Sequence, residues 1–155
     1  MKTLQSLVRL TVLVSAAVAI LTGCSSSDTK DLLPDVSVSV TALNFQVTVD
    51  EYQLQTVTVK NLNSRENVVL ERITSTNEVF RVGGYFTDGA LVPLETPITV
   101  EGNGARTIYI AFYPVEVGRH EGKLVVESRD SDDNPETDLV TLTGFGQPEA
   151  ETEDD

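Results

Sequence analysis

One segment near the carboxyl end gathers oxygen-bearing side chains at the density that a calcium site needs. Within RDSDDNPETD (Arg129–Asp138), acidic and amide residues occupy six of ten positions. Ca²⁺ takes roughly six to eight hard oxygen ligands, which such side chains supply. The same residues favour a tight turn, and we prefer the turn because the segment lacks the glycine and terminal glutamate of an EF-hand loop. The candidate calcium ligands are Asp130, Asp132, Asp133 and Asn134.

Catalytic and zinc chemistry lack the residues that they need. His120 is the only histidine, and the chain has a single cysteine. A serine nucleophile requires a base to take its proton, and a zinc site requires three or four Cys, His or carboxylate ligands. We therefore expect no catalytic residue, no enzyme activity and no cofactor, with Ca²⁺ as the alternative left open.

The amino-terminal residues have the pattern of an export signal. Lys2 and Arg9 form a basic start, and the run from Leu10 to Leu21 carries no charge. This run is shorter than the about 20 apolar residues that span a bilayer. A basic start, a short apolar run and small residues at its end are typical of a cleaved signal peptide.

The cysteine lies where this signal ends. Leu21-Thr22-Gly23-Cys24 resembles the lipobox of bacterial lipoproteins, in which the cysteine is acylated after cleavage. The resemblance implies a signal peptide over residues 1–23 and a covalent lipid on Cys24, and several acyl chains anchor a protein stably. Ser25, where an Asp would favour inner-membrane retention, implies the outer membrane facing the periplasm, with surface exposure open. Residues 24–35 are predicted to form a lipidated, flexible tether. A plain signal peptide with a chance cysteine is the alternative.

The charge balance excludes some partners. The net charge is -13, which repels phosphate backbones, so we expect no nucleic-acid binding. The membrane is reached through the lipid, and the acidic residues 147–155 are predicted to be a disordered tail.

The elements that must position these residues are short strands. Hydrophobic residues alternate with polar ones in many short runs from Val36 onward, and Asn, Asp, Gly and Pro bound the runs. This pattern predicts an all-β, immunoglobulin-like sandwich of about seven strands over residues 36–146. The runs are Val36–Val40, Leu43–Val49, Gln55–Leu62, Val68–Ser75, Phe80–Val82, Pro97–Glu101, Arg106–Pro114, Gly122–Ser128 and Leu139–Gly146.

The segment VGGYFTDGALVPL (Val82–Leu94) is unusually apolar for a predicted loop. Loops on a rigid scaffold often carry recognition, and aromatic residues are favoured at interface cores. Tyr85, Phe86 and Leu91 are therefore candidate partner contacts. Alternatively, these side chains fold back and cap one end of the sandwich.

The strand motifs together resemble a known group. Leu43 and Phe45 open the pattern and Asn61 follows the second strand; later matches are Ile110, Phe112, Pro114, Gly118, Gly122, Leu124, Val140, Leu142, Gly144 and Gly146. These residues resemble bacterial Ig-like domains of the abnormal-spindle/Hydin and major sperm protein type, similar to choice-of-anchor domains. The resemblance implies an interaction or scaffolding module without a shared catalytic set. We expect a membrane-anchored lipoprotein with a protein partner in the cell envelope; the alternative is an envelope glycan-binding or Ca²⁺-dependent adhesive domain.

Overall fold

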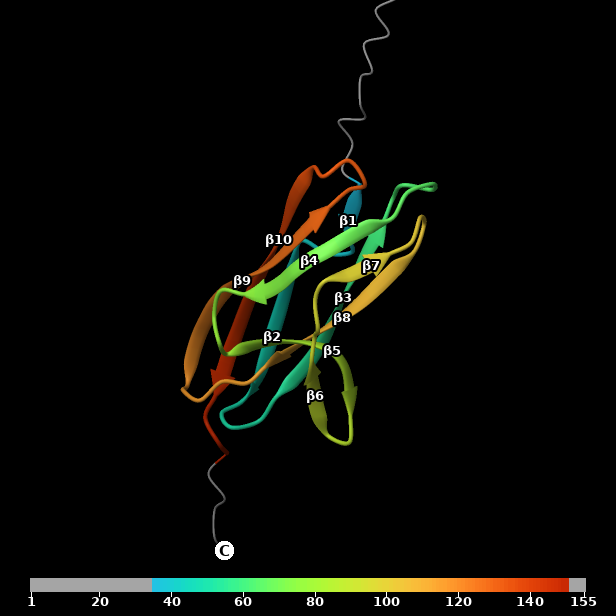
Figure 1. The fold of residues 1–155 in the computed structure, drawn as a ribbon. Helices are drawn as coiled ribbons and strands as arrows, with labels where there is room; N and C mark the ends of the chain where they lie inside the picture. The colour runs from blue at the N-terminus through green and yellow to red at the C-terminus, as the bar shows by residue number, and fades with distance from the viewer. Residues whose placement is uncertain (1–34, 151–155) are drawn as a thin grey trace, which may run out of the picture. The chain divides into compact units, whose positions relative to one another are not determined.

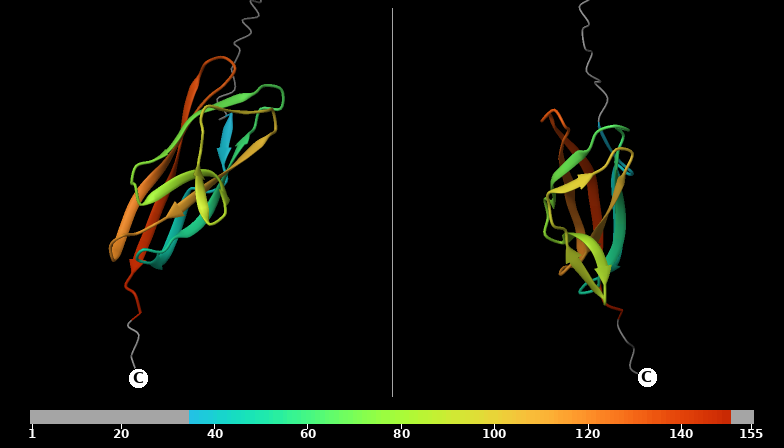
Figure 2. Two further views of the ribbon diagram at one scale, coloured as in Figure 1. Left: turned by 60° about the horizontal axis from the view of Figure 1, so that its bottom comes forward. Right: turned by 45° about the vertical axis from the view of Figure 1, so that its right-hand side comes forward.

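The computed structural model describes residues 35–150. Within them, ten β-strands form two five-stranded sheets that face each other (Figures 1 and 2). The first, here called the β3–β8 sheet, has the order β1 (Val36–Val38), β3 (Gln53–Asn61), β8 (Ala105–Phe112), β5 (Phe80–Thr87) and β6 (Ala90–Pro93). The second, the β9–β10 sheet, has the order β2 (Ala42–Thr48), β10 (Pro135–Gln147), β9 (Gly118–Arg129), β4 (Val68–Ser75) and β7 (Ile98–Val100).

Alternation along each strand builds the core between the sheets. In β8, Ile108, Ile110 and Phe112 are fully buried, because successive side chains of a strand point to opposite faces. The corresponding residues of β9 and β10 close the core from the other sheet. The buried hydrophobic cluster comprises Val36, Leu43, Phe45, Val57, Val59, Val68, Leu70, Ile73, Phe80, Val100, Ile108, Ile110, Phe112, Leu124, Val126, Val140 and Leu142.

The predicted fold class, an all-β Ig-like sandwich, is confirmed. The sequence predicts about seven strands, whereas the described residues form ten. The additional strand β6 lies in a segment predicted from the sequence to be a loop, and β5 continues to Thr87 instead of ending at Val82. The last strand includes Gln147, one residue past the predicted boundary of the sandwich.

The predicted signal peptide, Cys24, nearly all of the tether and the end of the acidic tail lie outside the described residues. Within residues 35–150 we find no helix with the length and apolar character that a membrane crossing requires.

A buried asparagine joins three segments of backbone at one end of the sandwich. Asn61 is only 1% exposed and ends β3. Its Nδ2 donates to the carbonyl oxygens of Glu66 at 2.8 Å and Val100 at 3.1 Å. It also lies 3.2 Å from the carbonyl oxygen of Glu101, and its Oδ1 accepts from the amide of Asn63 at 2.9 Å. Because buried polar groups need partners, the buried amide of Asn61 ties the segment before β4 to the end of β7.

Candidate functional site

The β5–β6 segment is a hairpin. Phe86 pairs with Leu91 and Thr87 with Ala90, so Asp88 and Gly89 form a two-residue turn. Both turn residues have positive φ, 51° and 76°, as the hairpin turn that matches strand twist requires. The Asp-Gly pair between β-prone residues was therefore a hairpin signal, and the loop interpretation of this segment was wrong in its secondary structure.

A bulge in β5 decides which side chains of the hairpin face outward. The pairing with β6 shifts between Gly83 and Tyr85, which leaves Gly84 as an extra residue. An extra residue reverses the alternation of faces beyond it. Phe86 consequently shares the outer face of the sheet with Arg81, and Tyr85 points to the opposite side with an exposed fraction of 53%.

The hairpin forms one wall of a groove of about 460 Å³ on the outer face of the β3–β8 sheet. The Tyr52 and Phe86 rings are in contact there, with centroids 5.7 Å apart. The guanidinium of Arg81 lies over the Tyr113 ring, 5.0 Å from its centroid. The groove is lined by Tyr52, Arg81, Val82, Phe86, Gly89, Ala90, Leu91, Pro93, Ala111 and Tyr113.

Backbone hydrogen bonds bring Tyr52 and Tyr113 to the same end of the domain. The amide of Asp50 donates to the carbonyl of Pro114 at 2.9 Å, next in sequence to Tyr113. The amide of Val49 donates to the carbonyl of Gln147 at 2.9 Å. Figure 1 shows the β2–β3 turn, the β5–β6 hairpin and the end of β10 together at the lower end of the sandwich.

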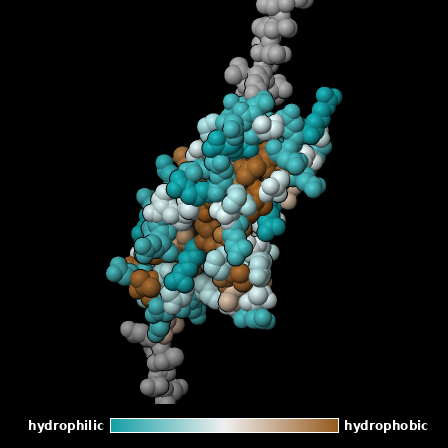
Figure 3. Space-filling view, viewed as in Figure 1, coloured by the Kyte–Doolittle hydropathy of each residue, from teal (hydrophilic) through white to brown (hydrophobic). Residues whose placement is uncertain are grey.

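The hairpin segment contributes both to the core and to the surface. In Figure 3, hydrophobic residues form separate patches on a largely hydrophilic face, and one patch lies over the β5–β6 hairpin. The side chains of Val82 and Leu94 pack against the core, so part of the segment does cap the sandwich. Phe86 and Leu91 instead stay half-buried at the groove surface.

Of the three predicted partner contacts, the structure brings two together. Phe86 and Leu91 line the groove, and Tyr85 does not. The sequence prediction missed Arg81, which lies at the start of β5, and Tyr52 and Tyr113, which come from distant parts of the chain. The only available signal was that Tyr113 and Arg81 alternate with core residues of their strands and therefore had to face outward.

The groove differs in charge from the rest of the protein. Arg81 is the only charged side chain among its lining residues, and no acidic side chain lines it. The chain as a whole carries 24 acidic and 11 basic residues. On an otherwise acidic chain, a groove whose only charged side chain is an arginine favours a ligand with a negative charge, which the remaining surface repels.

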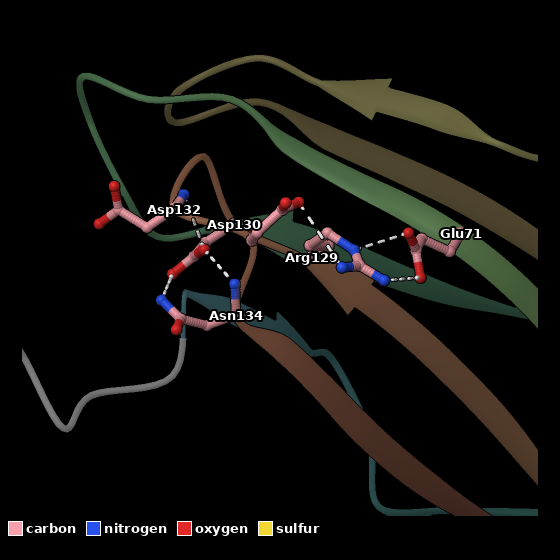
Figure 4. Close-up of polar contacts among 6 residues, drawn as sticks. Glu71, Arg129, Asp130, Asp132 and Asn134 are labelled. Carbon is pink, nitrogen blue, oxygen red and sulfur yellow. Dashed lines mark hydrogen bonds and ion pairs between the residues drawn. The ribbon is translucent and has the colours of Figure 1, made fainter.

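The predicted calcium segment has the geometry of a turn (Figure 4). Asp130 accepts from the amides of Asp132 at 2.9 Å and Asn134 at 2.8 Å through Oδ1. Its Oδ2 accepts from Nδ2 of Asn134 at 2.7 Å. Asp133, at φ 68°, lies 3.6 Å from Arg129, which also pairs with Glu71 at 2.8 Å. Figure 4 shows the carboxylate of Asp132 directed away from that of Asp130.

The described residues include no group of three or more His, Cys, Asp or Glu side chains placed to hold a metal ion. His120 has a structural position: its ring contacts Phe112, and its Nε2 lies 3.1 Å from the carbonyl oxygen of Glu116. In the Asp-rich turn, the Asp130 carboxylate thus accepts from backbone and side-chain groups of the turn itself, and the Asp133 carboxylate lies beside Arg129.

Two carboxyl groups near the other end of β10 are partly withdrawn from water. Burial raises the pKa of Asp138, whose Oδ2 is buried and has no hydrogen-bond partner within residues 35–150. Burial and the neighbouring Asp138 charge also raise the pKa of Glu136, although backbone hydrogen bonds from Val36 and Asp35 oppose this. Both groups therefore bind protons more readily in the folded than in the unfolded chain.

Asp138→Asn is expected to stabilise the domain at pH 7. A carboxyl group with a raised folded-state pKa favours folding at low pH, and this contribution is lost as pH rises through that pKa. The advantage of the variant should therefore shrink as pH falls below the folded-state pKa of Asp138. Urea unfolding at pH 7 and pH 4 measures both effects, with the exposed Glu51→Gln as the charge-matched control. Equal stability of Asp138→Asn and the parent at pH 7 would contradict the burial penalty.

Comparison with known proteins places the sandwich in a family. A protein-family model described as Cep192 domain 4 matches residues 33–147. A search of curated proteins found no significant match.

Three solved structures share the fold at low sequence identity. The ASH/PapD-like domain 7 of human CEP192 has a TM-score of 0.55 and 15% identity, over 75% of this chain and 87% of that chain. The Vibrio cholerae VesB protease has a TM-score of 0.54 and 12% identity, over 72% of this chain and 32% of that chain. The periplasmic chaperone SfaE has a TM-score of 0.51 and 11% identity, over 72% and 57%. At these identities the likeness is one of fold.

Proposed function

The chain belongs to the Cep192 domain 4 family. From this membership and from the lipobox-like residues Leu21–Cys24, we propose that it is a membrane-anchored, non-catalytic Ig-like lipoprotein that mediates protein–protein contacts or scaffolding in the bacterial cell envelope. The Ig-like, PapD-type fold is that of a protein-interaction module. SfaE is a periplasmic chaperone, which is consistent with such a module working in the envelope.

One observation carries the proposed contact function: the groove beside the β5–β6 hairpin presents a half-exposed aromatic pair on a rigid sheet. Tyr52 is 47% exposed and is held against Phe86. Tyrosine and arginine are the side chains that most often dominate binding energy in protein interfaces, and both line this groove. A rigid sheet also limits the entropy lost when a partner docks.

The anchor is supported by the sequence. The lipobox-like Leu21–Cys24 follows a basic and then apolar segment, and Cys24 is the only cysteine that could carry a lipid. Ser25 favours the outer membrane, facing the periplasm. Residues 24–35 then join the lipid to β1, and at roughly 3.3–3.6 Å per residue they span up to about 40 Å.

Glycan binding is the alternative, and its requirement for aromatic rings on one sheet face is met by Tyr52, Phe86 and Tyr113. However, the polar side-chain groups of the groove are only the two tyrosine hydroxyls and Arg81. A sugar buries many hydroxyl groups, and each one left without a partner costs binding energy. The predominantly apolar lining therefore favours a protein partner over a glycan.

The function is tested by photo-crosslinking in intact cells of the full chain with p-benzoylphenylalanine at position 52. We expect the chain in the membrane fraction and a discrete adduct with another protein, because Tyr52 is exposed and lines the groove. Cys24→Ser should abolish labelling by radioactive palmitate and move the chain out of the membrane fraction, since it removes the acylated sulfur.

Two controls accompany this experiment. Ser26→Ala changes a neighbour of Cys24 and should leave the membrane fraction unchanged. The crosslinker at Leu139, 52% exposed on a strand of the other sheet, should not give the same adduct. Membrane retention of Cys24→Ser would refute the anchor, and a chain that crosslinks to no protein from position 52 would refute contact at the groove.

A further inference from the structure

We propose that the groove binds an extended, otherwise neutral peptide segment that packs an apolar side chain on the Tyr52–Phe86 pair and places one carboxylate against Arg81. This inference rests on the proposed function and adds the chemistry of the partner. It follows from the lining of the groove, from the charge of that lining and from the position of Arg81.

The apolar part of the site is formed by side chains that precede β3 and that belong to the β5–β6 hairpin. Tyr52 and Phe86 are in ring contact, and Leu91 and Pro93 of β6 line the same groove. Its volume of about 460 Å³ falls in the range of ligand sites, roughly 300–1,000 Å³. A Phe or Leu side chain from a partner would cover apolar surface that is half-exposed in the free protein.

The charged part of the site is Arg81. Its guanidinium lies over the Tyr113 ring, and within residues 35–150 no carboxylate forms an ion pair with it. The ring holds the guanidinium in place while leaving its N–H donors free to bind. Arginine donors match a carboxylate in a two-point geometry, which gives orientation as well as affinity.

Because the whole chain is acidic, we expect the partner segment to carry few negative charges. The net charge of -13 repels a highly acidic segment. At physiological salt, charges beyond about 8 Å are largely screened, so one carboxylate in contact with Arg81 gains the ion pair and meets little of that repulsion. A single acidic residue next to an apolar one therefore fits better than an acidic tract.

The test uses the full chain in detergent and fluorescein-labelled Gly-Ser peptides that contain Phe-Glu, Phe-Ser-Glu or Phe-Ser-Ser-Glu. Matched peptides carry Gln or Lys in place of Glu, and fluorescence anisotropy gives the affinities. A hydrogen-bonded charge is worth roughly tenfold in affinity. At least one Glu peptide is therefore expected to bind about tenfold tighter than its Gln counterpart, and the Lys peptide weaker still.

Variants assign this preference to the groove. Arg81→Gln should abolish the difference between Glu and Gln peptides, whereas Arg106→Gln should preserve it, because Arg106 is an exposed arginine of the same sheet outside the groove. Phe86→Ala should weaken all peptides, whereas Tyr85→Ala, next to it on the opposite face, should not. Unchanged far-ultraviolet spectra show that these variants are folded.

The inference is overturned if no Glu peptide is preferred, if the preference survives Arg81→Gln, or if the N-acetylglucosamine tetramer displaces the peptides. An adduct from position 52 together with any of these results would leave the proposed contact function standing and remove only the peptide chemistry. Absence of that adduct would instead count against the proposed function itself.

Discussion

Gly144→Ala is expected to lower the free energy of unfolding by about 3 kcal/mol, at the upper end of what overpacking costs in a well-packed core. A Cβ on Gly144 would overlap the ring carbons Cε2 and Cζ of Phe112 and lie 2.8 Å from Cδ2. Phe112 is fully buried, stacks on Phe80 with ring centroids 5.0 Å apart and contacts the tilted Phe45 ring at 5.7 Å. The ring therefore has no free volume to move into, since protein interiors are close-packed.

Urea unfolding of the full chain measures this loss as a lower midpoint at an unchanged slope. Gly122→Ala is the matched comparison on the neighbouring strand. Its Cβ would lie 3.1 Å from Cβ of Asn77 and 3.2 Å from the Phe80 ring, which requires only a small shift. We expect less than half the effect of Gly144→Ala.

A second substitution tests the cause. Phe112→Leu removes ring atoms from the space that the new Cβ needs, so the double variant should be more stable than the sum of the two single effects implies. Strict additivity would show that the overlap with Phe112 is not the source of the loss.

Asn61→Ala is expected to cost roughly 2–4 kcal/mol, since it removes the side-chain donor to the carbonyl oxygens of Glu66 and Val100 and leaves a buried cavity. The side chain is 1% exposed, and its Nδ2 lies within 3.2 Å of three carbonyl oxygens from two separate segments. Alanine retains none of these interactions, and a water molecule could replace them only where the cavity admits it. The loss should be measured in the same urea experiment.

Asn61→Asp keeps the shape of the side chain but removes its amide donor, so it tests the donor by itself. It retains an oxygen that can accept from the amide of Asn63 but turns a carboxylate toward the three carbonyls. It should destabilise at least as much as alanine at pH 7. Asn63→Ala, at a half-buried turn where water can reach the backbone, should cost less than about 1 kcal/mol. Equal effects at positions 61 and 63 would contradict the role given to Asn61.

The pattern of alternation was enough to predict the fold class and most strand positions. Val68–Ser75 is a strand with the predicted bounds, and the alternate residues Ile108, Ile110 and Phe112 are buried as expected. Resemblance to a family also singled out Asn61 and Gly144, whose physical reasons are the carbonyl cluster and the Phe112 ring. The acylation of Cys24 is argued from the sequence and stays a prediction.

The candidate site could be predicted only in part, because its geometry depends on pairing between distant segments. Phe86 and Leu91 were found from their apolar character in a polar context. The orientation of these side chains could not be predicted, because the bulge at Gly84 reverses the face of the sheet on which each later residue of β5 lies.

The sequence by itself therefore determined that this chain buries alternate residues in an all-β sandwich, because a period of two is a local property of each strand. Only the tertiary structure decided that Tyr52, Arg81, Phe86 and Tyr113 meet in one groove. The register between neighbouring strands and the placement of one extra residue determine that meeting, and neither can be deduced from the local pattern of any single strand.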